Sequence, residues 1–201
     1  PTDLIHRHEH FGHGAKVMLH VYGNEAVKKA FYDAVLIDRF LAHPLDEAVR
    51  FVKVTPFCDF MADDYHIIPV AADHDPREAC LIYIIEKDGT CMLYGHDTGM
   101  NLSAQAWDCI CSRRYDLISL DATMGKKQIP GYHMGLADDV AFVRRLSEHG
   151  CIDQNTVRVI SHFSHNGEMT HEQLETFAKE HGMTAAYDGM TVTFKTACKG
   201  R

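Results

Sequence analysis

The sequence lacks the features that would place the protein in a membrane or on a nucleic-acid backbone. No apolar run approaches the roughly 18 residues of a membrane span, and the start, PTDLIHRHEH, lacks the charged-then-apolar pattern of a signal peptide. Acidic residues outnumber basic ones, 28 to 20, which gives a formal net charge of -8. No broad basic surface is therefore expected, and the sequence predicts a cytoplasmic protein without a membrane or nucleic-acid partner.

A disulfide framework and a zinc-ribbon spacing are also missing. The seven cysteines are odd in number and mostly lie in apolar stretches such as EACLIYII and GTCMLYG, where a free thiol packs as a small hydrophobe. Cys109 and Cys111 form a CxC without a second pair. No repeat, low-complexity tract or Pro/Gly/Ser linker divides the chain, so a single domain over residues 1–201 is expected.

What is present is an alternation of short β-branched runs with helical patterns. The runs predict strands at 16–23, 49–57, 65–72, 79–87, 90–95, 115–122, 157–162, 185–189 and 190–194. Asp-Gly pairs in EKDGT and YDGMT indicate hairpins. Helices are predicted over 24–43, 103–112, 135–150 and 170–182, with N-caps at Asn24 and Thr170 and stops at Gly150 and Gly182. The fold class is therefore α/β (α+β), with sheets covered by helices.

Fifteen histidines are many for this length, and three metal-binding side chains follow predicted strands: His74, Asp97 and His162. Imidazole and carboxylate are the ligands that a catalytic metal requires. Each residue also has an ordinary explanation. His74 fits a solvated loop, Asp97 in GHDTG fits a turn in which the carboxylate bonds backbone amides, and the HxxH of His162 and His165 is a weak pattern alone.

A family resemblance adds to this set. The segments PVAADHD, MLYGHDTG, LISLDATMG, GYHMG, VRVISHFSHNG and AAYDGM resemble the later motifs of metallo-β-lactamase-fold hydrolases. The branch that they resemble most includes the cyclic phosphodiesterase of phosphonate degradation. The resemblance implies an αββα sandwich. It also implies that His74 binds a first metal ion, that Asp97 bridges two, and that His162 binds the second.

The same resemblance suggests roles for His133 and His165, and Asp121 has two possible interpretations. His133 is similar to a histidine that contacts the substrate phosphate or assists the leaving group. His165 is similar to a position that binds a separate structural zinc in some members. Asp121 is interpreted either as a residue that orients a ligand histidine or as a turn-capping carboxylate after a strand.

The implied function is a hydrolase that uses two divalent ions, zinc or manganese, to activate a bridging water against a small phosphodiester. A non-catalytic or degenerate scaffold of the same fold is the alternative. It is favoured by one absence, because the family's HxHxDH motif has no match. The nearest candidate, HRHEHFGH with His6, His8 and His10, lacks one position. We therefore expect a chain whose N-terminal strands of one sheet are truncated, with an open sheet edge that a second copy could cover as a homodimer.

Overall fold

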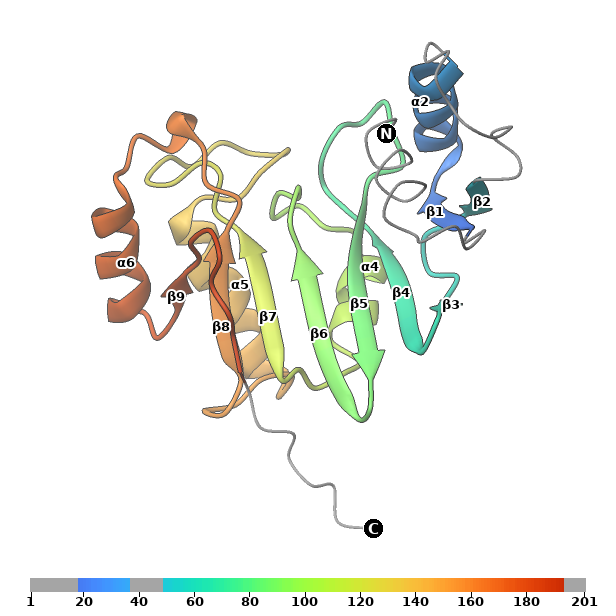
Figure 1. Ribbon diagram of the computed structural model, residues 1–201. Helices are drawn as coiled ribbons and strands as arrows, with labels where there is room; N and C mark the ends of the chain where they lie inside the picture. The colour runs from blue at the N-terminus through green and yellow to red at the C-terminus, as the bar shows by residue number, and fades with distance from the viewer. Residues whose placement is uncertain (1–17, 37–48, 194–201) are drawn as a thin grey trace. The chain divides into compact units, whose positions relative to one another are not determined.

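The computed structural model describes residues 18–36 and 49–193 of the 201-residue chain. It divides into two compact units, residues 1–55 and 56–201, which are described separately (Figure 1). Several predicted features lie outside the described residues: His6, His8, His10, the end of the helix over 24–43 and Cys198.

The first unit contains a parallel strand pair with a helix between the strands in sequence. Its elements are β1 (Leu19–Gly23), α2 (Glu25–Leu36) and β2 (Val49–Lys53), and Leu19 pairs with Val49 at the start of the parallel register. Asn24 caps α2 as predicted, since its Oδ1 accepts the amide of Val27 at 2.8 Å. Buried Phe31 and Val49 form a small core here.

The second unit contains a seven-stranded mixed sheet in the order β3-β4-β5-β6-β7-β8-β9. Pairing is antiparallel from β3 to β6 and parallel from β6 to β9. The strands are β3 (Phe60–Ala62), β4 (Tyr65–Ala71), β5 (Leu81–Lys87), β6 (Thr90–Gly95), β7 (Leu117–Asp121), β8 (Val157–Ser161) and β9 (Thr184–Ala185). The predicted EKDGT hairpin joins β5 to β6, and Asp88 and Gly89 both have the positive φ that such a tight turn requires.

Helices cover this sheet and bury its core. Helices α4 (Ala104–Ile110) and α5 (Leu136–Glu148) pack side chains such as Trp107 and Phe142 against Ile84, Leu93 and Leu120 of the sheet. Helix α6 (His171–Glu180) lies beside β9 in Figure 1. Its Leu174 and Ala178 belong to a second hydrophobic cluster, together with residues of β8 and β9. The remaining element is the short 3-10 turn η1 (His165–Gly167). The α/β fold class with helix-covered sheets is thus confirmed.

Local signals at the helix ends also hold. Thr170 and Gln173 form the predicted capping box of α6, and Gly150 and Gly182 both have positive φ at helix ends. Among the cysteines in the described ranges, five are free thiols: Cys58, Cys80, Cys109, Cys111 and Cys151. Among the described helices, none is long and apolar enough to cross a membrane.

The strand assignments differ from the sequence prediction at β3 and near the end of the described residues. Strand β9 ends at Ala185, whereas a strand was predicted over 185–189. Residues 191–193 form no strand, so the hairpin predicted at YDGMT is wrong, although the turn exists: the Met190 amide donates to the Tyr187 carbonyl at 3.0 Å. An alternating pattern makes a strand only where a partner supplies ladder hydrogen bonds. Conversely, the three-residue strand β3 was missed because FMA is too short to show alternation.

His66 ties the antiparallel part of the sheet to neighbouring loops. On β4, its Nδ1 lies 2.8 Å from Glu86 Oε2 on β5, and its Nε2 lies 2.7 Å from Asp59 Oδ2. Hydrogen bonds to Asp59 and then to Glu86 raise the pKa of His66 above its ordinary value of 6.5. Folding therefore stabilises the imidazolium form of His66 relative to the unfolded chain.

The contacts of His66 with Asp59 and Glu86 predict that its contribution to the free energy of unfolding depends on pH. Because the folded pKa is raised, the contribution of His66 is complete below the unfolded pKa of about 6.5 and disappears as pH rises through the folded value. We expect His66→Ala to lower the free energy of unfolding by up to about 1 kcal/mol more at about pH 6 than at about pH 9, measured by urea unfolding. His149→Ala, which removes an exposed histidine bonded only to a backbone carbonyl, should show no such difference. An equal loss at both pH values would contradict the assignment.

Candidate metal centre

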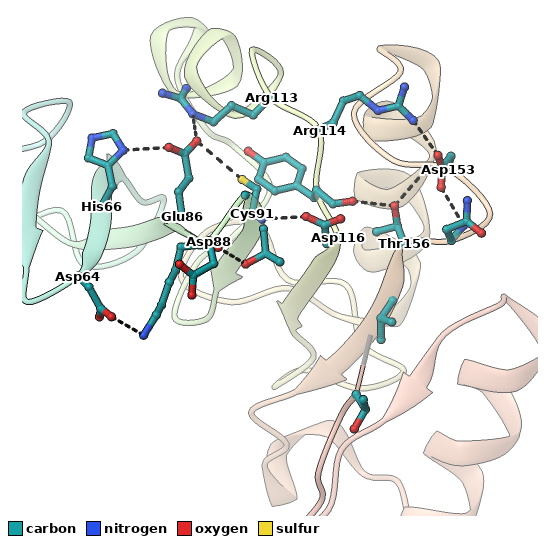
Figure 2. A pocket seen from close by; sticks show the side chains of 17 residues that line it. Asp64, His66, Glu86, Asp88, Cys91, Arg113, Arg114, Asp116, Asp153 and Thr156 are labelled. Carbon is teal, nitrogen blue, oxygen red and sulfur yellow. Dashed lines mark hydrogen bonds and ion pairs between the residues drawn. The ribbon is translucent and has the colours of Figure 1, made fainter. Parts of the chain in front are cut away.

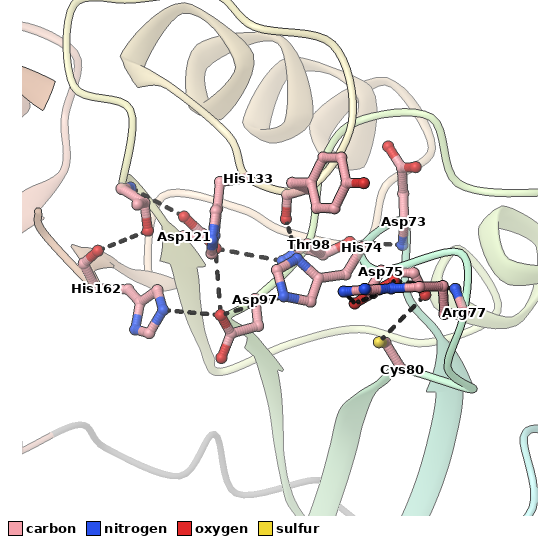
Figure 3. A network of polar contacts seen from close by, with 12 residues as sticks. Asp73, His74, Asp75, Arg77, Cys80, Asp97, Thr98, Asp121, His133 and His162 are labelled. Carbon is pink, nitrogen blue, oxygen red and sulfur yellow. Dashed lines mark hydrogen bonds and ion pairs between the residues drawn. The ribbon is translucent and has the colours of Figure 1, made fainter. Parts of the chain in front are cut away.

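Four potential metal ligands converge at the C-terminal ends of the parallel strands, the edge where open α/β sheets bind ligands. Asp97 follows β6, Asp121 ends β7, His162 follows β8, and His133 lies on the loop before α5. One donor atom from each lies within 4.8 Å of the others, and Figure 3 shows the four side chains turned toward one another. The ends of three strands and one loop therefore bring two imidazoles and two carboxylates together at this edge of the sheet.

The distances divide this group into two pairs. His162 Nε2 lies 2.9 Å from Asp97 Oδ1, and His133 Nδ1 lies 2.8 Å from Asp121 Oδ2. Between the pairs, His133 Nδ1 is 3.8 Å from Asp97 Oδ1. Donor atoms about 3 to 4 Å apart can share one ion with bonds of about 2.0 to 2.2 Å.

Asp121 is fully buried, and three groups donate hydrogen bonds to its carboxylate. The Thr123 amide donates to Oδ1 at 2.9 Å, whereas the Thr98 amide and His133 Nδ1 donate to Oδ2, the amide at 3.2 Å. A buried carboxylate needs such donors to offset its loss of water. This arrangement fixes the ring of His133 and fits the orienting role weighed for Asp121, although the histidine that it orients is His133.

His74 approaches the Asp97 carboxylate from the loop after β4. Its Nδ1 lies 2.6 Å from the carbonyl oxygen of Tyr132. Because a carbonyl only accepts, Nδ1 carries the proton, which leaves Nε2 as a free lone pair 3.9 Å from Asp97 Oδ1. A histidine held in this way is prepared to bind a metal through Nε2.

The backbone at the site is strained. Asp97, Tyr132 and His162 have φ of 55°, 61° and 62°, a left-handed conformation that side-chain-bearing residues adopt rarely. Three of the seven such non-glycine residues in the described ranges therefore lie at this one site. Strain of this kind persists where surrounding structure enforces it, typically at functional positions.

His96, which sequence reasoning missed, supports His162 from the side. Its ring stacks on that of His162 with centroids 5.7 Å apart, and its Nε2 lies 2.8 Å from Ser119 Oγ. Burial, followed by the charge of His162, lowers the pKa of His96. The signal was available in the sequence, because His96 stands directly before Asp97.

Asp139 was also not anticipated. It lies in the first turn of α5, fully buried, and neither carboxylate oxygen has a hydrogen-bond partner among the described residues. Burial, and next the charge of Asp121, raises its pKa well above the ordinary range. The neutral acid is therefore the favoured form of Asp139.

Five of the six predicted site residues lie together, and one lies apart. His74, Asp97, Asp121, His133 and His162 meet at one sheet edge. His165 lies apart from them on η1, with an exposed side chain, and its structural-zinc role stays a prediction.

Close backbone contacts fix the loops that carry these residues. Gly99 packs against Gly131, since a Cβ on Gly99 would lie 3.0 Å from the Gly131 carbonyl carbon. Gly125, with φ of +50°, packs against Gly167, where an added Cβ would lie 2.5 Å from the carbonyl oxygen. The loop before α5 is therefore clamped to the loops after β6 and β8.

A groove of about 1360 Å³ lies at the opposite, N-terminal ends of β6, β7 and β8 (Figure 2). Its basic side chains are each paired with acidic ones: His66 with Asp59 and Glu86, Lys87 with Asp64, Arg113 with Glu86, and Arg114 with Asp153. No basic group in this lining is left free to bind an anion, so the groove is a weaker candidate than the metal centre.

Solved structures share this architecture. YhfI from Bacillus subtilis, described as a metallo-β-lactamase fold protein, superposes with a TM-score of 0.61 at 17% identity, over 90% of this chain and 66% of YhfI. Zn²⁺-bound PqqB from Methylobacterium extorquens gives 0.61 at 14% identity, over 88% and 63%. The short form of human tRNase Z gives 0.58 at 15% identity, over 90% and 68%.

At these identities the likeness shows the fold alone, and the chain spans about two-thirds of the length of YhfI and PqqB. Comparison with protein-family models and with curated protein sequences finds no match.

The contact between Gly125 and Gly167 yields a stability prediction. Alanine at position 125 must adopt a left-handed backbone, at about 1–2 kcal/mol, and also displaces the Gly167 backbone, at about 1–3 kcal/mol more. Gly89→Ala is the matched control, because Gly89 also has positive φ but an added Cβ meets nothing within 4 Å. Chemical unfolding should show a larger loss for Gly125→Ala. Equal losses would mean that the clamp contributes nothing.

Proposed function

We propose, from the metallo-β-lactamase fold that the chain has, that it is a metal-dependent hydrolase whose substrate is a phosphodiester. The observation that supports this most directly is the convergence of imidazole and carboxylate groups at the C-terminal ends of β6, β7 and β8. Neither hydrophobic packing nor fold stability calls for four such groups at one place, since grouped carboxylates repel one another.

The donor set fits a divalent ion such as zinc or manganese. His74 and His162 would hold it together with Asp97, whose Oδ1 lies 3.9 Å from Nε2 of His74 and 2.9 Å from Nε2 of His162. When bound, such an ion lowers the pKa of a coordinated water and polarises the substrate's phosphoryl oxygen.

His133 and Asp121 form a separate proton-handling pair. Because Nδ1 of His133 donates to the buried carboxylate, the ring's other nitrogen, Nε2, is the one available to a substrate. Histidine suits proton transfer near neutral pH, and in this role Nε2 would protonate the leaving-group oxygen. Asp121 is then a positioning residue, because it acts through His133.

One comparison favours phosphodiester chemistry over other hydrolyses, and the net charge of the chain bears on the size of the substrate. Human tRNase Z, which has this fold, is by name a nuclease that acts on tRNA, and RNA cleavage breaks phosphodiester bonds. A net charge of -8 disfavours capture of a long polyanion, so the substrate is expected to be small. The metal, rather than the surface, would supply the positive charge.

Metal content and hydrolysis together test the proposal. Protein purified without chelator should retain at least one divalent ion per chain by elemental analysis and should hydrolyse bis(p-nitrophenyl) phosphate. His162→Ala should lose both. His133→Ala should keep the metal. For a diester with an alkoxide leaving group, which departs only when it is protonated, kcat should fall by about 10²- to 10⁴-fold, whereas bis(p-nitrophenyl) phosphate, whose p-nitrophenolate leaves unprotonated, should be affected much less.

The contrary outcomes have distinct meanings. Loss of metal in His133→Ala would show that His133 is a ligand and that the pairing with Asp121 is not its role. Native protein that retains no metal and hydrolyses nothing would favour the alternative function, a binding or scaffold protein of this fold. His181→Ala, an exposed position on α6's C-terminal end, controls for general effects of removing a histidine.

A further inference from the structure

The loop before α5 exposes an aromatic side chain beside the metal centre. Tyr132 is 51% exposed, and its ring meets that of His74 edge to face with centroids 5.8 Å apart. A tyrosine exposed singly on a surface needs no explanation. This one is different because the backbone is arranged to hold it there.

Three features fix the position of Tyr132. Its φ of 61° follows a φ of 79° at Gly131, so two successive left-handed residues make a sharp turn. Its carbonyl accepts the hydrogen bond from His74 Nδ1 at 2.6 Å. Gly131 in turn lies against Gly99. The residue that carries the ring is therefore the one whose carbonyl orients His74, a proposed metal ligand. Its left-handed backbone is unfavourable, and the half-exposed ring gains too little from burial to offset that cost.

Arg77, which interacts electrostatically with Tyr132, is paired with an acidic residue. Arg77 has an 85% exposed side chain, yet its Nε and Nη2 bond the Asp75 carboxylate at 2.9 and 2.6 Å. That hydrogen bonding is the main cause of the raised pKa of Arg77, and Tyr132 adds a smaller electrostatic contribution. Because the Asp75 carboxylate offsets part of the Arg77 charge, a second anionic group on a substrate would gain less there than beside an unpaired arginine.

We propose that Tyr132 forms an outer subsite that binds a neutral aromatic ring attached to the substrate phosphate, as in an aryl or nucleobase-bearing phosphodiester. This inference rests on the proposed function for the phosphate and adds the class of its substituent. The ring of the substrate stacks on Tyr132 while the phosphate occupies the metal centre next to His74. Tyr132 is thus a specificity residue, and Ile129 on the same loop, 47% exposed, is not part of the subsite.

Two phosphonates that differ only in the ring test the subsite by equilibrium binding. Phenylphosphonate and methylphosphonate carry the same head group, and neither is hydrolysed. Isothermal titration of metal-loaded protein should show phenylphosphonate binding about 10-fold more tightly, the scale of one aromatic stacking contact. Tyr132→Ala should abolish this preference without changing the affinity for methylphosphonate, and Tyr132→Phe should retain it.

Two variants guard against a structural artefact. Tyr132→Asn removes the ring while tolerating the left-handed backbone and should behave as Tyr132→Ala does. Ile129→Ala should keep the native preference. A preference that survives in both ring-deleted variants, or that is missing from the native protein while methylphosphonate binds, overturns the subsite alone. Failure of methylphosphonate itself to bind overturns the proposed phosphate site, and the subsite with it.

Discussion

The buried carboxylate of Asp121 is the constraint on which the candidate site depends. Its three donors come from the loop after β6, the residues just after β7 and the loop before α5. Without these hydrogen bonds, each of these connecting segments could adopt other conformations. A fully buried carboxylate that loses a partner costs several kcal/mol, so the three segments are tied to one geometry, and His133 with them.

This arrangement explains why the centre lies at one edge of the sheet. Parallel strands β6, β7 and β8 end together, and their ends deliver Asp97, Asp121 and His162 without any long excursion of the chain. In the groove at the other ends of the same strands, the basic side chains are paired with acidic residues of the protein. Unlike the groove, the metal centre keeps a free nitrogen, Nε2 of His74, directed toward Asp97.

The sequence predicted most of the elements because their signals are local. The strand over 90–95 matches β6 residue for residue, and Thr170 with Gln173 marked the start of α6. Strand β9 is shorter than predicted and 190–194 was wrong within the described residues, because pairing partners cannot be read from alternation. The placement of the site residues came from strand ends and from family resemblance. The contact of His74 with the Tyr132 carbonyl spans 58 positions, and the pairing of Asp121 with His133 depends on loop geometry, so neither could be derived from periodicity.

The left-handed backbone at Asp97 and His162 narrows what evolution can place there. Besides glycine, the residues that tolerate this conformation best are asparagine, aspartate and histidine, and two of these are common metal ligands. β-Branched residues are excluded by their own shape before any chemistry is considered. The backbone conformation therefore limits the substitutions that positions 97 and 162 tolerate. Apart from glycine, the tolerated residues have side chains that still offer an oxygen or nitrogen to a cation.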